Sequence, residues 1–305
     1  MSLNAYVHSL IDNVEQKNFP NEIDLVLDGG AFNGSYMIGA LFYLKEIERR
    51  EKIEIKRISG CSIGSVLGLF FLLNKLDLLL PLCIKACKII RKSQDLKKFK
   101  KALNNLMMKN ITKDDLSNIN GKLYITYFDT IKRKQIIKKN YKNTDELRES
   151  ILKSTHVPYL IDREITDNEG CVDGCFPYIF KQNKRENKKI LFINLQSFDK
   201  LINMIYIKNE KNLYPRIFNG LKDIHTFFSN KTNTNMCSYV NEWDIKDILL
   251  FRLREIIYTL IIYILSIGLQ IEHIVPSSWK NEKIIVKLIS IFKTLLRDLI
   301  INITI

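Results

Sequence analysis

A serine stands between two glycines in the stretch Gly60-Cys61-Ser62-Ile63-Gly64, where an alternating apolar run ends and a second apolar run begins. A Gly-x-Ser-x-Gly step between a strand and a helix is typical of a nucleophile elbow, a sharp turn that projects the serine hydroxyl over the edge of a sheet. Gly60 and Gly64 would relieve the crowding at such a bend. The spacing therefore predicts that Ser62 is a nucleophile.

A second glycine-rich stretch, residues 28–34 (DGGAFNG), follows the apolar run 23–27. A nucleophilic serine needs backbone amides aimed at the oxyanion that develops on the substrate. In a parallel sheet this loop would lie beside the turn at Ser62, which predicts an oxyanion hole in five residues: Gly29, Gly30, Ala31, Gly34 and Ile63. A nucleotide-binding turn and a purely structural turn remain open as alternatives, although the phosphate-loop lysine and the third glycine of a dinucleotide fingerprint are both missing.

The serine also needs a base, and the sequence offers two kinds of candidate. Asp173 follows a short apolar piece and precedes Gly174, which lets the chain turn sharply. An aspartate can accept the proton if it is held within hydrogen-bonding reach of the hydroxyl. Among the four histidines, we expect His156 to be structural, whereas His225 or His273 would be the base of a histidine-assisted esterase.

The apolar patterns predict the elements that must position these groups. Strands are expected at residues 23–27, 53–59, 123–129, 134–139 and 188–195. Helices are expected after Gly34, after Ser62, over 81–118 and over 143–154. The order strand, helix, strand, helix at the start of the chain predicts an α/β fold with a parallel sheet.

Composition limits the class of protein. The chain has 305 residues and 46% hydrophobic content, which favours a globular fold over disorder. The first twenty residues carry no secretory pattern, so we expect a cytoplasmic protein with reduced cysteines, and the cysteine spacing predicts no metal site. Residues 256–271 form an uncharged run of sixteen, shorter than the roughly twenty residues of a membrane span. We expect a buried or interface-lying helix there, and residues 284–305 to pack on the core or lie on a bilayer.

The net charge of +14 is concentrated in residues 85–142, which contain 17 Lys and Arg and only 4 Asp and Glu, a local charge of +13. Such a stretch attracts polyanions such as phospholipid headgroups or nucleic acid. A solvated, lysine-rich face with no ligand is the alternative.

Together these stretches resemble the patatin-like phospholipase family over about residues 23–195. Residues 25–41 (LVLDGGAFNGSYMIGAL) are similar to its oxyanion loop and following helix, and GCSIGS is similar to its nucleophile elbow. VDGC resembles the Asp-Gly step of its serine–aspartate dyad, and residues 154–158 (STHVP) resemble the Ser-x-x-x-Pro segment that precedes it. The resemblance implies that Ser62 is the nucleophile and Asp173 the general base.

The resemblance also implies a three-layer α/β/α fold with a central, mostly parallel sheet. We expect a helical lead-in at 1–22, a catalytic domain at 23–199 and a mainly helical region at 200–305, packed on that domain or appended to it. The implied activity is a phospholipase A type hydrolysis of glycerolipid acyl esters through a covalent acyl-enzyme, without metal or cofactor. Residues 85–142 would then dock on an anionic membrane surface, and no nucleic acid partner is expected.

Three residues depart from the family pattern. Ala31 replaces a third glycine, Asn33 replaces an Arg or Lys, and Cys175 replaces a Gly or Ala. These departures keep open a catalytically inactive lipid- or polyanion-binding protein on the same scaffold.

Overall fold

The computed structural model describes residues 3–93, 96–162, 164–182, 188–197, 200 and 212–274, and residues 287, 291 and 294 individually. Seven strands form one sheet in the order β4-β3-β2-β1-β6-β7, and β5 pairs with β3. Their bounds are β1 Glu22–Leu27, β2 Glu54–Cys61, β3 Leu123–Asp129, β4 Lys134–Lys138, β5 Cys171–Asp173, β6 Lys189–Ile193 and β7 Cys237–Tyr239. The four central strands are parallel, whereas β4, β5 and β7 pair antiparallel with their neighbours.

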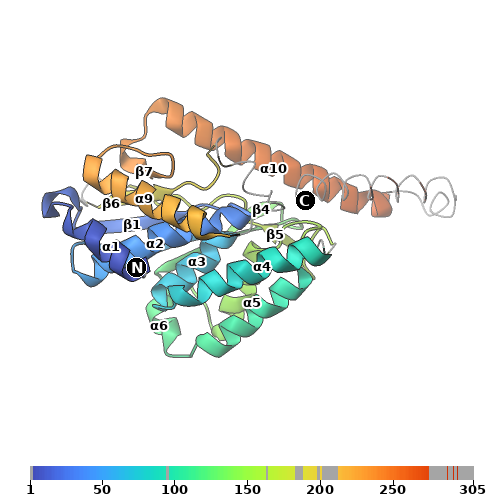
Figure 1. Ribbon diagram of the computed structural model, residues 1–305. Helices are drawn as coiled ribbons and strands as arrows, with labels where there is room; N and C mark the ends of the chain where they lie inside the picture. Colours follow the sequence, from blue (N-terminus) through green and yellow to red (C-terminus); the bar gives the residue numbers. More distant parts are fainter. Residues whose placement is uncertain are drawn as a thin grey trace.

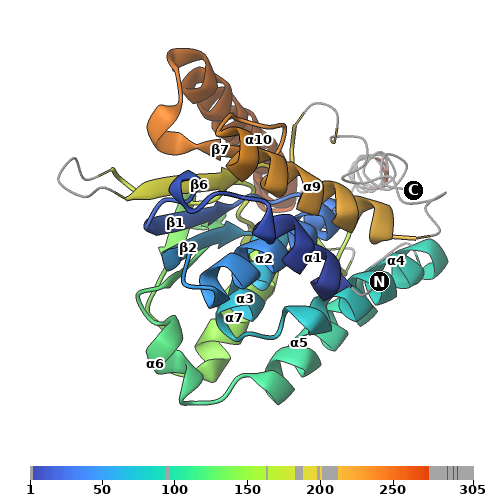
Figure 2. The ribbon, with the colours of Figure 1, turned by 60° about the vertical axis from the view of Figure 1, so that its left-hand side comes forward.

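Helices lie on both faces of this sheet (Figures 1 and 2). Their bounds are α1 Leu3–Asp12, α2 Gly34–Arg49, α3 Ile63–Leu72, α4 Leu79–Ser93, α5 Lys97–Asn110, α6 Asp115–Ile119, α7 Thr144–Ser154, α9 Tyr214–Asn230 and α10 Ile245–Ile274. Asn143 caps α7, since its side chain accepts a hydrogen bond from the Glu146 amide at 2.8 Å. A short 3₁₀ turn, Ala31–Asn33, lies between β1 and α2.

The two faces of the sheet are buried by different parts of the chain. Leu25 and Leu27 of β1 point into the main core, which α2, α3, α7 and α9 share. Val26, between them, points to the opposite face and packs in a cluster with Phe192 and Phe251. Because successive side chains of a strand alternate between faces, this division is a property of the β1 sequence. Phe251 belongs to α10, so α10 contributes the third layer of the three-layer α/β/α fold.

Helices α2 and α9 touch backbone to backbone within the main core. A Cβ atom added at Gly220 would lie 1.9 Å from the Tyr36 carbonyl oxygen, and one added at Gly39 would lie 1.9 Å from that of Ile217. The contact therefore requires glycine on both helices. Through it, α9 fixes the position of α2, the helix that follows the glycine-rich loop.

The structure confirms the predicted α/β order, and two strands were not predicted. β3 matches the predicted range 123–129, and β2 runs two residues further than expected, to Cys61. β5 and β7 have only three residues each, too few for an alternating pattern to be recognised. The uncharged run 256–271 lies inside the longer α10, and no helix among the described residues combines the length and apolarity of a membrane span. The predicted apolar segment 284–305 lies, apart from three single residues, outside the described residues.

Candidate active site

Strand register brings Ser62 and Asp173 to the same place. Cys61, the last residue of β2, pairs with Thr126 of β3, and Asp173 of β5 pairs with Tyr127, the next residue along β3. β5 thus lies beside β3 just beyond the end of β2. Ser62 follows Cys61 directly, and its hydroxyl lies near enough to the Asp173 carboxylate to favour the charged form of that carboxylate.

The main chain turns sharply at Ser62, which has φ 51° and ψ −130° and immediately precedes α3. A Cβ atom at Gly60 would lie 2.6 Å from the backbone of Gly64, and one at Gly64 would lie 2.5 Å from the Leu27 carbonyl oxygen. Side chains at these two positions would therefore collide with the backbone of the turn and of β1. This is the geometry that the Gly-x-Ser-x-Gly spacing predicted.

Ser154, the last residue of α7, holds this turn in place. Its Oγ accepts a hydrogen bond from the Ser62 amide at 2.9 Å and donates one to the Thr126 carbonyl at 2.7 Å. Ser154 is fully buried, so both bonds are protected from water. The sequence marked this residue only as part of a family-like segment, and its contact with the nucleophile backbone becomes apparent only in the structure.

Asp173 is buried, with 6% of its surface exposed. Burial raises its pKa to about 6, while the nearby Ser62 hydroxyl and a hydrogen bond from the Cys175 amide favour the charged form. The Cys175 amide lies 2.8 Å from Oδ1, and the Asp173 amide donates to the His156 carbonyl at 2.9 Å. The carboxylate is thus mostly ionised at neutral pH and yet a stronger base than an ordinary aspartate.

The other candidate bases make different contacts. His156 is fully buried and contributes its carbonyl to the backbone of Asp173. The ring of His225 lies 3.4 Å from the Tyr43 hydroxyl and 3.5 Å from that of Ser229, and neither contact involves Ser62. The side chain of His273 lies outside the described part of the structure.

The glycine-rich loop lies against the turn at Ser62, as the sequence predicted. A Cβ atom at Gly34 would lie 2.4 Å from Cγ1 of Ile63, and one at Gly29 would lie 3.3 Å from Cβ of Ser62. Within the described residues, the backbone amides of Gly30, Ala31 and Ile63 donate to no other group. These amides are therefore available to a bound oxyanion, whereas the Gly29 amide is occupied by Oδ1 of Asp28 at 3.0 Å.

The departures from the family pattern each have a structural consequence. Ala31 has φ 42° and Cys175 has φ 57°, values that favour glycine. Asn33 is buried and anchors the loop, since its amide donates to the carbonyls of Leu195 and Lys200, both at 2.9 Å. Arg216 of α9 donates to Oδ1 of Asn33 at 3.1 Å. A guanidinium thus reaches this loop from another helix, although the loop itself lacks a basic residue.

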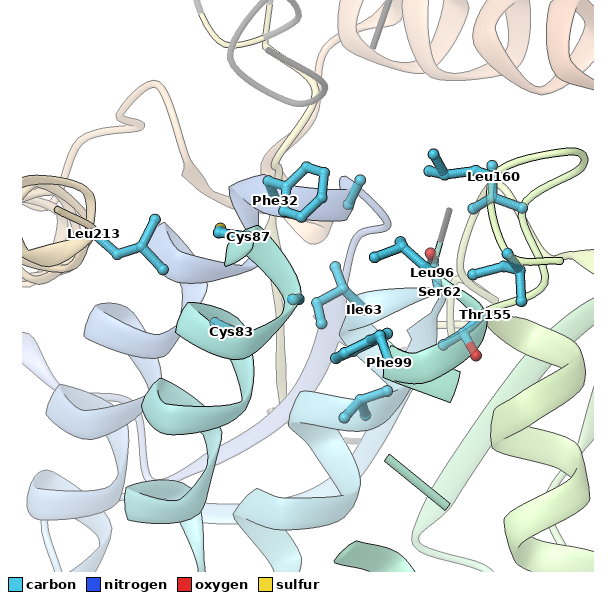
Figure 3. A pocket seen from close by; sticks show the side chains of 15 residues that line it. Phe32, Ser62, Ile63, Cys83, Cys87, Leu96, Phe99, Thr155, Leu160 and Leu213 are labelled. Atoms are coloured by element: carbon cyan, nitrogen blue, oxygen red, sulfur yellow. The ribbon is translucent and has the colours of Figure 1, made fainter. Parts of the chain in front are cut away.

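An apolar pocket opens beside Ser62 (Figure 3). The space in and in front of it is about 650 Å³, which includes solvent at its open mouth. Figure 3 shows Ser62 between Phe32 on one side and Leu160 and Thr155 on the other. The remaining lining residues are almost all apolar and come from α3, α4, α5, the segment after α7 and the residues just before α5 and α9: Ile63, Val66, Cys83, Ala86, Cys87, Leu96, Phe99, Val157, Ile161 and Leu213, with Ala31 of the glycine-rich loop.

Comparison with known proteins gives one family. No curated protein matches the sequence. The family model of patatin-like phospholipase matches residues 25–195, more than half of the chain, and this range includes Ser62, Asp173 and the glycine-rich loop. Members of this family are esterases and lipases, which supports hydrolysis of lipid esters as the class of activity. The match agrees with the three-layer fold and with the order of the sequence motifs, and the chain belongs to the patatin-like phospholipase family.

Proposed function

We propose that the protein is a phospholipase A type acyl hydrolase that cleaves glycerolipid esters with Ser62 as nucleophile and Asp173 as general base. The observation that carries this proposal is the position of the Ser62 hydroxyl beside the buried Asp173 carboxylate, at the edge of an apolar pocket. Both groups stand at the carboxyl ends of strands, next to amides that have no other partner in the described part of the chain.

The first half of the reaction transfers the acyl group to the enzyme. Ser62 Oγ bonds to the ester carbonyl carbon while Asp173 takes the hydroxyl proton. The amides of Gly30, Ala31 and Ile63 stabilise the oxyanion, and the positive end of α3, which starts at Ile63, adds to this effect. The bond from the carbonyl carbon to the lipid alkoxide then breaks, and Asp173 returns the proton to that leaving oxygen.

The second half releases the fatty acid. A water molecule gives a proton to Asp173 as its oxygen bonds to the acyl carbon of the ester on Ser62. The bond from Ser62 Oγ breaks, and the proton passes from Asp173 back to that oxygen. The same carboxylate thus serves as base and acid in both halves, a role that its pKa of about 6 suits at neutral pH.

The lining of the pocket supports a long apolar group on the substrate. Phe99, Leu160 and Leu213 lie on different sides of the pocket (Figure 3). Each methylene group of a substrate that is buried against such side chains stabilises the complex by about 0.8 kcal/mol. An acyl chain directed into the pocket would bring its carbonyl carbon to Ser62 at the pocket edge. We therefore assign the pocket to the acyl chain and leave the lipid headgroup outside it.

Charges around the pocket support docking on an anionic membrane. α4 and α5 both line the pocket, and exposed basic residues lie where the two helices approach each other: Arg91, Lys92, Lys97 and Lys98. The outer side of α10 exposes Ile256, Ile257 and Leu260. α10 extends to the same side of the molecule as these ends of α4 and α5 (Figure 1). Basic and apolar side chains together are the combination that binds an anionic lipid surface.

Covalent labelling tests the nucleophile directly. Purified protein is treated with a fluorophosphonate, the modified peptide is identified by mass spectrometry, and fatty acid release from phospholipid vesicles is measured in parallel. We expect modification of Ser62, and loss of both labelling and turnover in Ser62→Ala. Ser9→Ala, at an exposed position on α1, is the control and should behave as the unmodified protein does. If the unmodified protein shows no labelling and no turnover, the result favours the inactive, lipid-binding alternative.

A further inference from the structure

Helix α10 lies outside the residues that match the family, yet its inner side reaches the candidate active site. Phe251, Arg254, Tyr258 and Ile262 recur at intervals of three or four residues, which places them on one side of the helix. Phe251 and Ile262 are buried at the two ends of this row. The polar side chains between them point toward the loop that follows β1 and the turn that follows β5.

Arg254 binds the residue at the head of the glycine-rich loop. Its Nη1 and Nη2 donate to the two carboxylate oxygens of Asp28 at 2.8 and 3.2 Å, a bidentate pair. Asp28 is fully buried, and its Oδ1 also accepts the Gly29 amide. The guanidinium lies over the rings of Phe251 and Phe192, at 4.9 and 5.8 Å from their centroids. These contacts restrict Arg254 to one orientation, and with it the carboxylate that precedes the loop.

Tyr258 acts one helical turn further along. Its hydroxyl donates a hydrogen bond to Oε1 of Gln196, which fixes the direction in which the Gln196 amide points. Nε2 of Gln196 then donates to the Gly29 carbonyl at 3.0 Å and lies 3.5 Å from the Cys175 carbonyl. One side-chain amide thus joins the glycine-rich loop to the turn after Asp173, and Tyr258 orients that amide.

We propose that Arg254 and Tyr258, here called the α10 clamp, are positioning residues for ester hydrolysis. The clamp holds the loop with the oxyanion-binding amides at a fixed distance from the turn that carries Asp173. This inference rests on the proposed function, because it assigns a task in that reaction. Neither clamp residue lines the pocket beside Ser62, and among the described residues neither hydrogen-bonds to Ser62, so we expect the clamp to act on the geometry of the transition state. It therefore acts on kcat rather than on substrate binding.

Turnover of a short soluble ester, p-nitrophenyl butyrate, tests the clamp without involving membrane binding. Tyr258→Phe removes one hydroxyl and keeps the ring, and we expect kcat to fall about tenfold with KM within twofold. Arg254→Met should lower kcat at least a hundredfold. Arg254→Lys keeps the positive charge but cannot form the bidentate pair with Asp28, so its kcat should lie between those of Arg254→Met and the unmodified protein. Matched controls come from the same helix: Tyr263→Phe, whose hydroxyl binds the Arg133 carbonyl, and Arg252→Met, whose partner is Glu255. Both should leave kcat unchanged.

Hydrogen–deuterium exchange provides a readout that does not depend on activity. In Tyr258→Phe we expect faster exchange in peptides covering residues 28–34 and 173–176, and unchanged exchange in α7. Unchanged kcat together with unchanged exchange would overturn the clamp, even if Ser62→Ala is inactive. If the unmodified protein shows no esterase activity, the proposed function fails, and unaltered exchange in Tyr258→Phe would then overturn the clamp as well.

Discussion

Asp173→Asn is expected to lower turnover strongly and to stabilise the protein at neutral pH. Burial raises the pKa of Asp173 from its ordinary value of 3.8 to about 6. Between these two pH values the folded protein keeps a proton that the unfolded chain has already released. Stability therefore falls as the pH rises through this window, and the loss is complete above pH 6. At about 1.4 kcal/mol for each pH unit, the buried charge costs about 3 kcal/mol.

The asparagine carries no charge, so it avoids this cost while its carbonyl oxygen still accepts hydrogen bonds. The cost of about 3 kcal/mol already includes the hydrogen bonds to the carboxylate, because they contribute to its pKa of about 6. We expect Asp173→Asn to have a free energy of unfolding about 3 kcal/mol higher than the wild type at pH 7.5, and little different at pH 4. Turnover should fall by about 10²–10⁴-fold because the base is lost.

Urea denaturation at the two pH values, combined with the vesicle assay, measures both effects. Asp129→Asn, on the neighbouring strand, is a matched control because the pKa of Asp129 is shifted in the opposite direction. Burial acts to raise this pKa, but contacts with Lys132 outweigh burial and lower it. This variant should lose stability at pH 7.5. A stability difference for Asp173→Asn that does not change with pH would refute the argument from burial, and retained turnover would refute the role of Asp173 as base.

Three further predictions concern the loop, the core and the surface. Ala31→Gly should raise the free energy of unfolding by up to about 1 kcal/mol, because φ 42° is strained for alanine, whereas Ala31→Val should lower it; urea denaturation measures both. Gly220→Ala should lower the free energy of unfolding by about 3 kcal/mol, since the added methyl would lie 1.9 Å from the Tyr36 carbonyl; a normal melting temperature would contradict the close contact. Lys92→Glu with Lys98→Glu should weaken sedimentation with anionic vesicles at low salt and leave p-nitrophenyl butyrate turnover unchanged. Equal sedimentation of both proteins at every salt concentration would exclude docking through these lysines.

The local features of the site could be predicted from the sequence because each has a pattern of its own. Gly60 and Gly64 mark a turn that only small residues can make, and the apolar run 123–129 marks β3. Asp173 could be singled out only by its resemblance to a family motif, because β5 is too short to show alternation. The prediction that the two glycine turns face one another required only a parallel sheet.

The long-range features could not be predicted. Gln196 and Arg254 contact the loop from positions more than 160 residues away in the chain, and no spacing rule connects them to it. Tyr258 lies within an uncharged run that predicted a helix but gave no indication of which side faces the sheet. Ser154 sits at a helix end, where a serine ordinarily has only a local role. Such contacts depend on tertiary packing, which periodicity within one segment does not encode.

The cover that α10 provides over the sheet has a consequence for shortened forms of the protein. A fragment limited to residues 25–195 would retain Ser62 and Asp173. It would lack α10, so the aromatic side chains of Phe180 and Phe192 would be exposed to water. Exposed apolar area of this kind drives self-association. Truncation before α10 would therefore yield insoluble aggregates rather than a minimal hydrolase.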